Sequence, residues 1–388
     1  MKRIGILTHY YQSKNIGGLL QAYALCAFLR KHETAAEQIA FRFRPYSPQA
    51  HETYRRLFPQ RKTLKKFVRY LPYRLKQIFL RWRNRQIAPQ VAAQNSIFAK
   101  FEQFIPHSTG VYTEQTIRQA NACYDVFITG SDQVFASYLL PFSAYYGEFA
   151  APDKKVLAYA ASSDMKQFPP QAKTFFAQKI MRIDALSVRE KTLKAYIERI
   201  SDKKVTLVLD PTFLLTPEEW LQIANPAAVP PKPYILCYFL GEKSRWQRQK
   251  ARAFADTYGY ELVHLPYIMG AIRPADELLG GRGLYTVGPR EFIALVQQAQ
   301  CIFTDSFHGM AFALNFGKNF YVFDRDDASG AGSMNARITD TLDMLGLSQR
   351  RITDPNAVLD NTPLDFSSPQ RLLQEQKQLS QKWLMSAL

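Results

Sequence analysis

The stretch RIGILTHYYQSKNIGGLLQAYALCAFLRKHETAAEQIAFR, residues 3–42, predicts a strand, a loop, a helix and a second strand. Residues 3–8 form an apolar run, and residues 19–31 place apolar side chains at the spacing of an amphipathic helix. Residues 37–42 form the next apolar run, which we interpret as a strand. This order of elements is typical of the opening of a Rossmann-like domain.

Short apolar runs bounded by turn residues continue the alternation of strands and helices. Before residue 225 they predict strands at residues 126–129, 156–160, 185–188 and 205–209. The proline-rich segment at residues 225–233 suits neither a helix nor a sheet interior, so we place a domain boundary there. Beyond it, the pattern predicts strands at 234–240, 261–265, 301–304 and 321–323, and helices at 245–258, 289–298, 309–316 and 369–388.

The predicted fold class is therefore α/β, with two Rossmann-like domains whose parallel sheets are covered on both faces. We expect a first domain at residues 1–224 that carries a basic helical insertion at about 52–105. A second domain would occupy residues 225–366, and a helix at 367–388 would pack back on the first domain. The chain of 388 residues is long enough for two such cores.

The composition narrows the class of protein further. No run approaches the roughly 20 apolar residues of a membrane-spanning helix, and the first residues lack the apolar region of a signal peptide. The four cysteines are scattered among apolar neighbours without CxxC spacing, which predicts reduced core thiols and no metal site. We therefore expect a cytoplasmic protein without a metal.

The net charge of +17 indicates an anionic partner, and the positive charge is most concentrated in one segment. Residues 55–85 hold twelve Lys or Arg and no Asp or Glu, with apolar side chains at helical spacing and a bend expected near Pro72. The apolar stripe either packs on the first domain, leaving the cations solvated, or docks the protein on an anionic membrane face. In the second interpretation the protein is peripheral at the inner face of the plasma membrane, and the membrane-facing cations include Arg69, Arg74, Lys76 and Arg81.

A glycine-containing loop separates the first strand from the first helix. Asn15, Gly17 and Gly18 lie in this loop, at the edge of the sheet where a cleft is expected. The loop matches neither GxGxxG nor the phosphate-binding loop with a conserved lysine. We therefore predict neither a dinucleotide site nor a nucleotide-triphosphate site of those types.

Residues 304–309, TDSFHG, follow one predicted strand and open a helix. This places His308 at the carboxyl edge of a parallel sheet, where ligands bind. Free backbone N–H groups at the helix N-terminus suit an anion such as phosphate, and Gly309 permits close approach. The alternative is structural: Ser306 acts only as a helix cap and His308 only as a packed polar residue.

Two further motifs follow strands in the first domain. In SVRE, residues 187–190, Arg189 can grip a carboxylate or phosphate, or it forms a structural ion pair with Glu190 or another neighbouring residue. In TGSDQ, residues 129–133, Asp132 can act as a general base, or it forms a turn with Ser131.

Taken in order, these motifs resemble the polysaccharide pyruvyl transferase family. The resembling stretches are NIGGLLQAYAL at 15–25, YDVFITGSDQ at 124–133, SVRE at 187–190, DPTFLL at 210–215, TDSFHG at 304–309 and NARI at 335–338. The resemblance implies two Rossmann-like domains similar to those of GT-B glycosyltransferases. It also implies phosphoenolpyruvate as the donor substrate, no cofactor, and a sugar acceptor, lipid-linked or polymeric, on which a cyclic pyruvate ketal is formed.

The resemblance also implies roles for individual residues. Arg189 matches the family's donor-binding arginine and His308 its cleft histidine, while some relatives have arginine in place of Ser306. We expect Arg337 to supply the missing cation, His308 to act as the acid, and either Asp132 or Glu190 to act as the base. The donor would also contact Ser306, Gly309, Asn15, Gly17 and Gly18, and the acceptor would contact Ser131 and Gln133.

Two other functions fit parts of the sequence. A glycosyltransferase that uses a nucleotide sugar would share the fold, but apart from Asp305 no group of residues suits a ribose and a diphosphate. A nucleic-acid-binding protein would account for the charge, but no DNA- or RNA-binding module is recognisable. We therefore expect no nucleic-acid partner.

Overall fold

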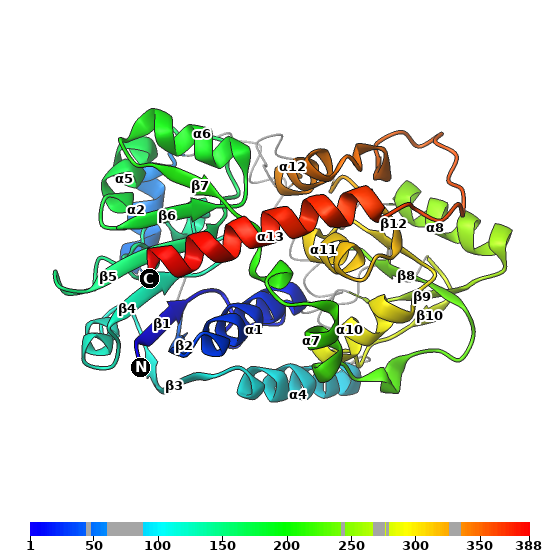
Figure 1. The fold of residues 1–388 in the computed structure, drawn as a ribbon, viewed down its shortest axis with the longest axis horizontal. Coiled ribbons are helices and arrows are strands. Elements are labelled where there is room, and N and C mark those ends of the chain that lie inside the picture. Colours follow the sequence, from blue (N-terminus) through cyan, green and yellow to red (C-terminus); the bar gives the residue numbers. More distant parts are fainter. Residues whose placement is uncertain (44–47, 60–87, 242–244, 267–275, 277–278, 326–334) are drawn as a thin grey trace, which may run out of the picture.

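The computed structural model describes residues 1–43, 48–59, 88–241, 245–266, 276, 279–325 and 335–388. Two parallel β-sheets lie side by side, one from each half of the chain, with helices packed around them (Figure 1). The predicted α/β class with two Rossmann-like domains is confirmed.

The first sheet has seven strands, all parallel, in the order β3-β2-β1-β4-β5-β6-β7. They are β1 (Arg3–Leu7), β2 (Ala35–Phe41), β3 (His107–Tyr112), β4 (Val126–Thr129), β5 (Lys155–Ala161), β6 (Ala185–Val188) and β7 (Val205–Leu207). The strand order reverses between β1 and β4, which are hydrogen-bonded neighbours. In open parallel sheets, a ligand crevice forms at such a reversal, beyond the carboxyl ends of the strands.

Alternate side chains of these strands enter two different cores. Ile4, Ile6 and Leu157 belong to the core shared with α1 (Ile16–Lys31) and α4 (Ala88–Phe104). Phe127 and Val156 belong to the core on the other face, shared with α2 (Pro48–Leu57), α5 (Pro170–Ile180) and α6 (Lys191–Ile200). Because both faces are covered, the strands are apolar at nearly every position, which is the pattern that marks them in the sequence.

The second sheet repeats the arrangement with six parallel strands in the order β10-β9-β8-β11-β12-β13. They are β8 (Tyr234–Tyr238), β9 (Glu261–His264), β10 (Arg282–Gly283), β11 (Cys301–Thr304), β12 (Asn319–Phe323) and β13 (Arg351–Ile352). Its helices are α8 (Arg245–Tyr258), α10 (Pro289–Gln298), α11 (Phe307–Asn315) and α12 (Ala336–Leu345). Here the order reverses between β8 and β11, so each sheet has one switch point.

Short helices complete the chain and connect the sheets. The connection from β7 to β8 contains η4 (Pro211–Phe213), α7 (Pro217–Ile223) and η5 (Pro226–Ala228). The remaining 3₁₀ helices are η1 (Ile117–Ala122), η2 (Ser137–Leu139), η3 (Ala144–Tyr146) and η6 (Ser348–Arg350). The proline-rich segment that the sequence places at a domain boundary therefore lies between the last strand of one sheet and the first strand of the other.

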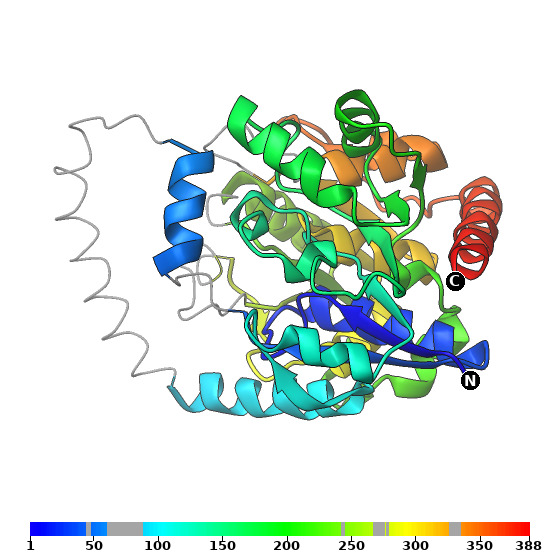
Figure 2. The same cartoon turned by 90° about the vertical axis from the view of Figure 1, so that its left-hand side faces the viewer.

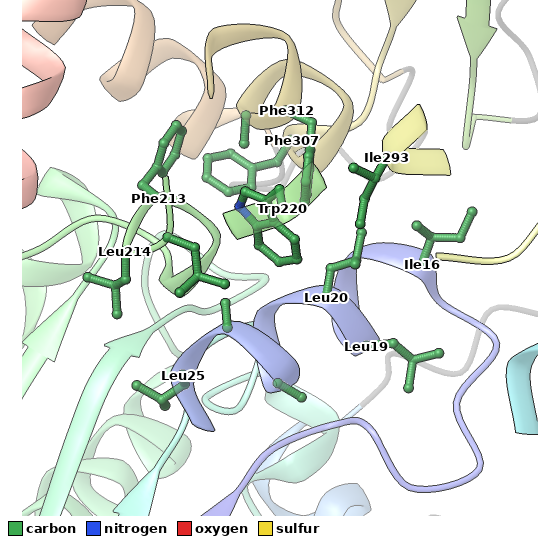
Figure 3. Close-up of a cluster of buried hydrophobic side chains, with 14 of the residues drawn as sticks. Ile16, Leu19, Leu20, Leu25, Phe213, Leu214, Trp220, Ile293, Phe307 and Phe312 are labelled. Atoms are coloured by element: carbon green, nitrogen blue, oxygen red, sulfur yellow. The ribbon is translucent and has the colours of Figure 1, made fainter. Parts of the chain in front are cut away.

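One apolar cluster runs without interruption from the first half of the chain into the second. Its centre is Trp220 of α7, which is fully buried and packs edge-on against Phe312 of α11, with 4.9 Å between the ring centroids. Figure 3 shows the side chains of α1 on one side of this tryptophan and those of α10 and α11 on the other. The two halves are thus joined by a hydrophobic core as well as by the chain itself.

The last helix, α13 (Ser367–Ala387), crosses from the second half to the first (Figure 1). At its far end, the Ser380 hydroxyl accepts a hydrogen bond from the Leu209 backbone N–H, and Gln381 donates one to the Leu214 carbonyl. Trp383 lies 6.1 Å from the ring of Tyr159, a residue of β5. These contacts attach the C-terminal helix to the first sheet.

Helices α2 and α4 flank the predicted basic segment, and α2 lies on the opposite side of the molecule from α13 (Figure 2). Residues 60–87, including Arg69, Arg74, Lys76 and Arg81, lie outside the described part of the chain. No helix among the described residues is long and apolar enough to cross a membrane. One sequence expectation is wrong: Cys123 is exposed, whereas the other three cysteines are buried.

Candidate active site

The switch points of the two sheets face a common cavity of about 640 Å³. Its walls come from segments that follow the carboxyl ends of β1 and β4 in the first half and of β8, β11 and β12 in the second. The lining residues are His9, Gln12, Ser13, Lys14, Asn15, Asp132, Gln133, Tyr138, Leu240, Ser306, Phe307, His308, Arg325 and Arg337. Of the predicted site residues, this cavity gathers Asn15, Asp132, Gln133, Ser306, His308 and Arg337.

His308 lies in the first turn of α11, directly against the glycines of α1. Ser306 caps this helix by accepting a hydrogen bond from the Gly309 N–H at 3.4 Å. A Cβ atom at Gly17 would lie 2.0 Å from Nδ1 of His308. Gly17 is therefore required, because the imidazole occupies the space that a side chain would fill. A glycine of the first half thus makes room for the histidine of the second half.

Asn15 caps α1 in the same way, since its side chain accepts a hydrogen bond from the Gly18 N–H at 3.2 Å. A Cβ atom at Gly309 would lie 2.4 Å from Oγ1 of Thr304, so this glycine permits the tight turn from β11 into α11. The predicted donor-contacting glycines thus have packing roles in the structure. Two helix N-termini, from α1 and α11, nevertheless end at the cavity and offer partial positive charge to an anion.

Asp210 is the ionic centre behind the cavity. Its fully buried carboxylate accepts hydrogen bonds from Arg189 Nη1 at 2.5 Å and from the Ser131 hydroxyl at 2.9 Å. Nε2 of His308 lies 3.8 Å away. Burial raises the pKa of Asp210, but the charge of Arg189 and the contacts with His308 and Thr212 outweigh burial and hold this pKa far below its usual range. The group is therefore a carboxylate at neutral pH.

Arg189 follows β6 and is held between two carboxylates. Besides Asp210, its Nη2 atom lies 3.5 Å from Asp132, and the guanidinium lies 5.0 Å from the centre of the Phe307 ring. The buried Nε and Nη2 atoms have no hydrogen-bond partner. Of the structural ion pairs considered from the sequence, Arg189 forms pairs with its neighbours Asp132 and Asp210 and not with Glu190.

Arg189 and Asp210 line a second, mainly apolar cavity of about 210 Å³, which shares Phe307 with the first. Arg337, at the start of α12, approaches the same ring, with its guanidinium 5.8 Å from the ring centre. Burial and the neighbouring Arg189 lower the pKa of Arg337 to about 10, which leaves it charged at neutral pH. Nε of Arg337 is also buried without a hydrogen-bond partner. The aromatic ring therefore holds two arginines from different halves close together.

Asp132 has the backbone conformation of a left-handed residue, with φ of 71°, in the turn after β4. Burial raises the pKa of this carboxyl, but Arg189, His308 and Arg337 together lower it below its usual value. Asp132 is therefore ionised and lines the cavity, as a general base requires.

Glu190 and Ser131 do not line the main cavity, and neither do the predicted residues Arg189, Gly17, Gly18 and Gly309. One carboxylate oxygen of Glu190 accepts a hydrogen bond from the Ser162 hydroxyl, and burial raises the pKa of the group. The Ser131 hydroxyl is fully buried and engaged by Asp210. Glu190 and Ser131 thus form hydrogen bonds behind the cavity, whereas Gln133 lines it.

Sequence reasoning missed several lining residues, chiefly His9, Tyr138 and Arg325. His9 follows β1 at the carboxyl edge of the sheet, so the rule that singled out Asp132 and His308 applies to it as well. Asp210 was part of a quoted motif but was given no role. Among the described residues, no group of three His, Cys, Asp or Glu side chains could hold a metal ion.

Two Rossmann-like halves whose switch points face a cavity lined by cationic and histidine side chains define an α/β protein with a candidate active site between its halves. The chain belongs to the polysaccharide pyruvyl transferase family, since the model of that family matches residues 15–327. It is a transferase of polysaccharide biosynthesis, and the resemblance inferred from the six motifs is confirmed.

Solved structures with a similar fold are far more distant in sequence. UDP-GlcNAc 2-epimerase from Methanocaldococcus jannaschii is 11% identical, with a TM-score of 0.49 over 96% of this chain and 92% of that chain. The same enzyme from Neisseria meningitidis is 13% identical, with a TM-score of 0.46 over 97% and 99%. The glycosyltransferase SnogD from Streptomyces nogalater is 11% identical, with a TM-score of 0.45 over 98% and 95%. No curated protein matches the sequence.

Proposed function

We propose that this transferase moves the pyruvyl group of phosphoenolpyruvate to two hydroxyls of a saccharide, forming a cyclic ketal and releasing phosphate. The observation that carries the proposal is a set of arginines at and behind the cavity, Arg189, Arg325 and Arg337, each of which has at least one buried guanidinium nitrogen without a hydrogen-bond partner. Phosphoenolpyruvate brings a carboxylate and a phosphate, and such anions are held by charged donors of this kind. The two helix N-termini at the cavity add to the same attraction.

The reaction requires one proton delivered to carbon and two removed from hydroxyls. The methylene carbon C3 of the donor takes up a proton, and the first sugar hydroxyl forms a bond to C2 as its own proton leaves. The bond between C2 and the phosphate oxygen then breaks. The second hydroxyl forms the other C2–O bond as its proton passes to the departing phosphate. Positive charge that develops at C2 is offset by the nearby carboxylates, and the departing phosphate stays paired with arginines.

His308 and Asp132 are the groups of the chain best placed for these proton transfers. His308 lines the cavity and can donate the proton to C3. Asp132 lines the same cavity and is ionised, so it can accept a hydroxyl proton. Glu190, the other base considered from the sequence, has no place in the cavity lining, so we assign the base role to Asp132 alone.

Phosphate release tests this function directly. The purified protein is incubated with phosphoenolpyruvate and a panel of saccharides, and the release of phosphate is measured together with ketal formation by mass spectrometry. We expect acceptor-dependent release that His308→Ala removes. Nucleotide sugars serve as the competing donor class: if they stabilise the protein against heat and phosphoenolpyruvate does not, the glycosyltransferase alternative replaces this proposal.

We also propose that the acceptor is lipid-linked and that the segment at residues 55–85 brings the enzyme to the anionic inner face of the membrane. The support is its sequence, with twelve Lys or Arg and no acidic residue. Each cation close to an anionic surface adds about 1 kcal/mol of attraction. Co-sedimentation with liposomes should rise with the content of anionic lipid and fall with salt.

The control for membrane binding compares two variants that each lose four positive charges, one inside the basic segment and one elsewhere on the surface. Changing Arg69, Arg74, Lys76 and Arg81 to Gln should reduce sedimentation. The same change at four exposed lysines elsewhere, Lys166, Lys173, Lys204 and Lys232, should reduce it much less. Equal sedimentation with neutral and anionic vesicles, or equal loss in both variants, would contradict docking by this segment.

A further inference from the structure

Several residues that line the cavity have a buried polar atom without a hydrogen-bond partner. The two walls of the cavity differ in the kind of side chain that carries these atoms. On the wall from the second half, these atoms belong to His308, Arg325 and Arg337. On the wall from the first half, they are Nε2 of His9 and Nε2 of Gln133. Buried polar atoms without partners are costly, so each set indicates a ligand group that satisfies it. The cationic wall suits an anion, whereas the wall of His9 and Gln133 suits an uncharged ligand.

His9 is held as a neutral ring. Burial lowers the pKa of His9 below the usual value of 6.5, although Asp132 and a contact with the Gln133 backbone act in the opposite direction. Its Nδ1 atom lies 3.4 Å from the Tyr145 hydroxyl, which leaves Nε2 for another partner. The imidazole and the Gln133 amide therefore offer hydrogen bonds without net charge at neutral pH.

Tyr138 adds a flat apolar surface to the same wall. It lines the cavity and is 43% exposed, which is unusual for a large aromatic side chain in this protein. Its ring lies 6.3 Å from that of His9 and 6.3 Å from that of Phe43, and Phe43 in turn contacts Phe142 at 4.6 Å. One side of the ring is thus fixed by other aromatics while part of its surface remains accessible.

We propose that His9, Gln133 and Tyr138 form the subsite for the acceptor sugar, with the sugar ring packed on Tyr138 and its hydroxyls bonded to His9 and Gln133. A pyranose has exactly this mixture of chemistry, an apolar C–H face and a rim of uncharged hydroxyls. An aromatic ring with a few placed polar groups is the usual lining of a small-molecule site. Asp132 lines the same cavity and interacts electrostatically both with His9 and with His308 and Arg337, so a sugar hydroxyl bound here would be near the proposed base. The inference rests on the proposed function, because the donor occupies the opposite wall.

Binding measurements with the full-length protein test the subsite. The probes are the methyl β-glycosides of galactose, glucose and mannose, titrated by saturation-transfer NMR in the presence of phosphoenolpyruvate. Loss of one aromatic contact is worth about 1 kcal/mol, so Tyr138→Ala should weaken the best-bound sugar about 5- to 10-fold. Tyr138→Phe keeps the ring face and should recover most of that loss. Gln133→Leu should weaken the sugar by a similar factor.

The readouts separate this inference from the proposed function. Tyr138→Ala should leave the affinity for phosphoenolpyruvate within 2-fold, roughly the error of such a titration. Tyr258→Ala removes a tyrosine of similar exposure, 38%, on α8 and serves as the matched control that should bind sugar normally. Normal sugar affinity in Tyr138→Ala, or no sugar binding by the wild type, would overturn the subsite. Failure of phosphoenolpyruvate to bind the wild type would instead overturn the proposed function.

Discussion

Asp210 shows how one carboxylate can organise groups from both halves of the chain. It bonds Arg189 and Ser131 of the first half and lies 3.8 Å from His308 of the second. In the sequence, its neighbours Pro211 and Thr212 suggest only a helix cap, which it also is, since it accepts the Thr212 N–H. The role at the site was not predictable because it depends on residues that the fold brings together from distant positions.

The ionisation of Asp210 gives a pH-dependent prediction for stability. Asp210→Asn removes the nearer of the two carboxylates that flank the buried Arg189, which should cost about 3–5 kcal/mol at pH 7. The folded-state pKa of Asp210 lies below the unfolded value of about 3.9, so its contribution is fully present above that value and declines as pH falls. The difference in the free energy of unfolding between wild type and Asp210→Asn should therefore decrease by roughly 1.4 kcal/mol per pH unit below about pH 4. Urea unfolding at several pH values measures it, and a constant gap would contradict the assignment.

Arg189 and His308 should respond differently to removal, because only Arg189 neutralises a buried acid. Arg189→Ala leaves the buried carboxylate of Asp210 without its arginine partner. We therefore expect a loss of about 3–5 kcal/mol in stability and a loss of donor binding. His308→Ala should change stability by only about 1 kcal/mol while lowering kcat by roughly 10²- to 10⁴-fold. Thermal unfolding and steady-state kinetics on both variants check this, and equal destabilisation of the two would argue for a structural role of the histidine.

At the scale of elements, the sequence located most strands and helices, and the errors have local causes. Helix α1 begins at Ile16, three residues before the predicted start, because Asn15 caps it while Gly17 and Gly18 hide the apolar pattern. Strand β3 was not predicted: its sequence HSTGVY contains a glycine and polar residues, and it lies at the edge of the sheet. An edge strand needs fewer apolar side chains, so the pattern that marks the central strands is weak there.

The same reasoning explains which site residues were found. Asp132 and His308 directly follow strands, so the rule about carboxyl edges identified them. Ser131 and Glu190 follow strands too, but their side chains point into the protein, which a sequence pattern cannot distinguish. Tyr138 was missed because it lies several residues beyond β4, in the short helix η2.

The contact between α1 and α11 predicts an effect of a single methyl group. Gly17→Ala would place a Cβ atom 2.0 Å from Nδ1 of His308, so the imidazole must move. A displacement of about 1 Å at a catalytic group can cost roughly 100-fold in turnover, and we expect a loss in kcat of that order. A double-mutant cycle provides the control, since Gly17→Ala should add little once His308→Ala is present. Wild-type turnover in Gly17→Ala would contradict the packing.

The continuous core has a consequence for the unfolding of the whole molecule. Trp220 and its neighbours belong at once to the packing of α1, α10 and α11, so neither half can unfold without exposing part of the other. We therefore expect a single cooperative transition in urea, although the chain has two sheets. Circular dichroism and tryptophan fluorescence should give coincident curves. Two separated transitions would show that the halves are energetically independent.

The meeting of Gly17 with His308 also limits how this enzyme can be recombined with its relatives. A chimera that takes its first half from one family member and its second from another inherits the imidazole of His308 from one parent and the space for it, at Gly17, from the other. If the parent that supplies the first half has a larger residue at the position of Gly17, the histidine of the chimera would be displaced. Crossovers placed at the linker between the sheets should therefore succeed only when the glycine loop and the histidine turn are exchanged as a matched set.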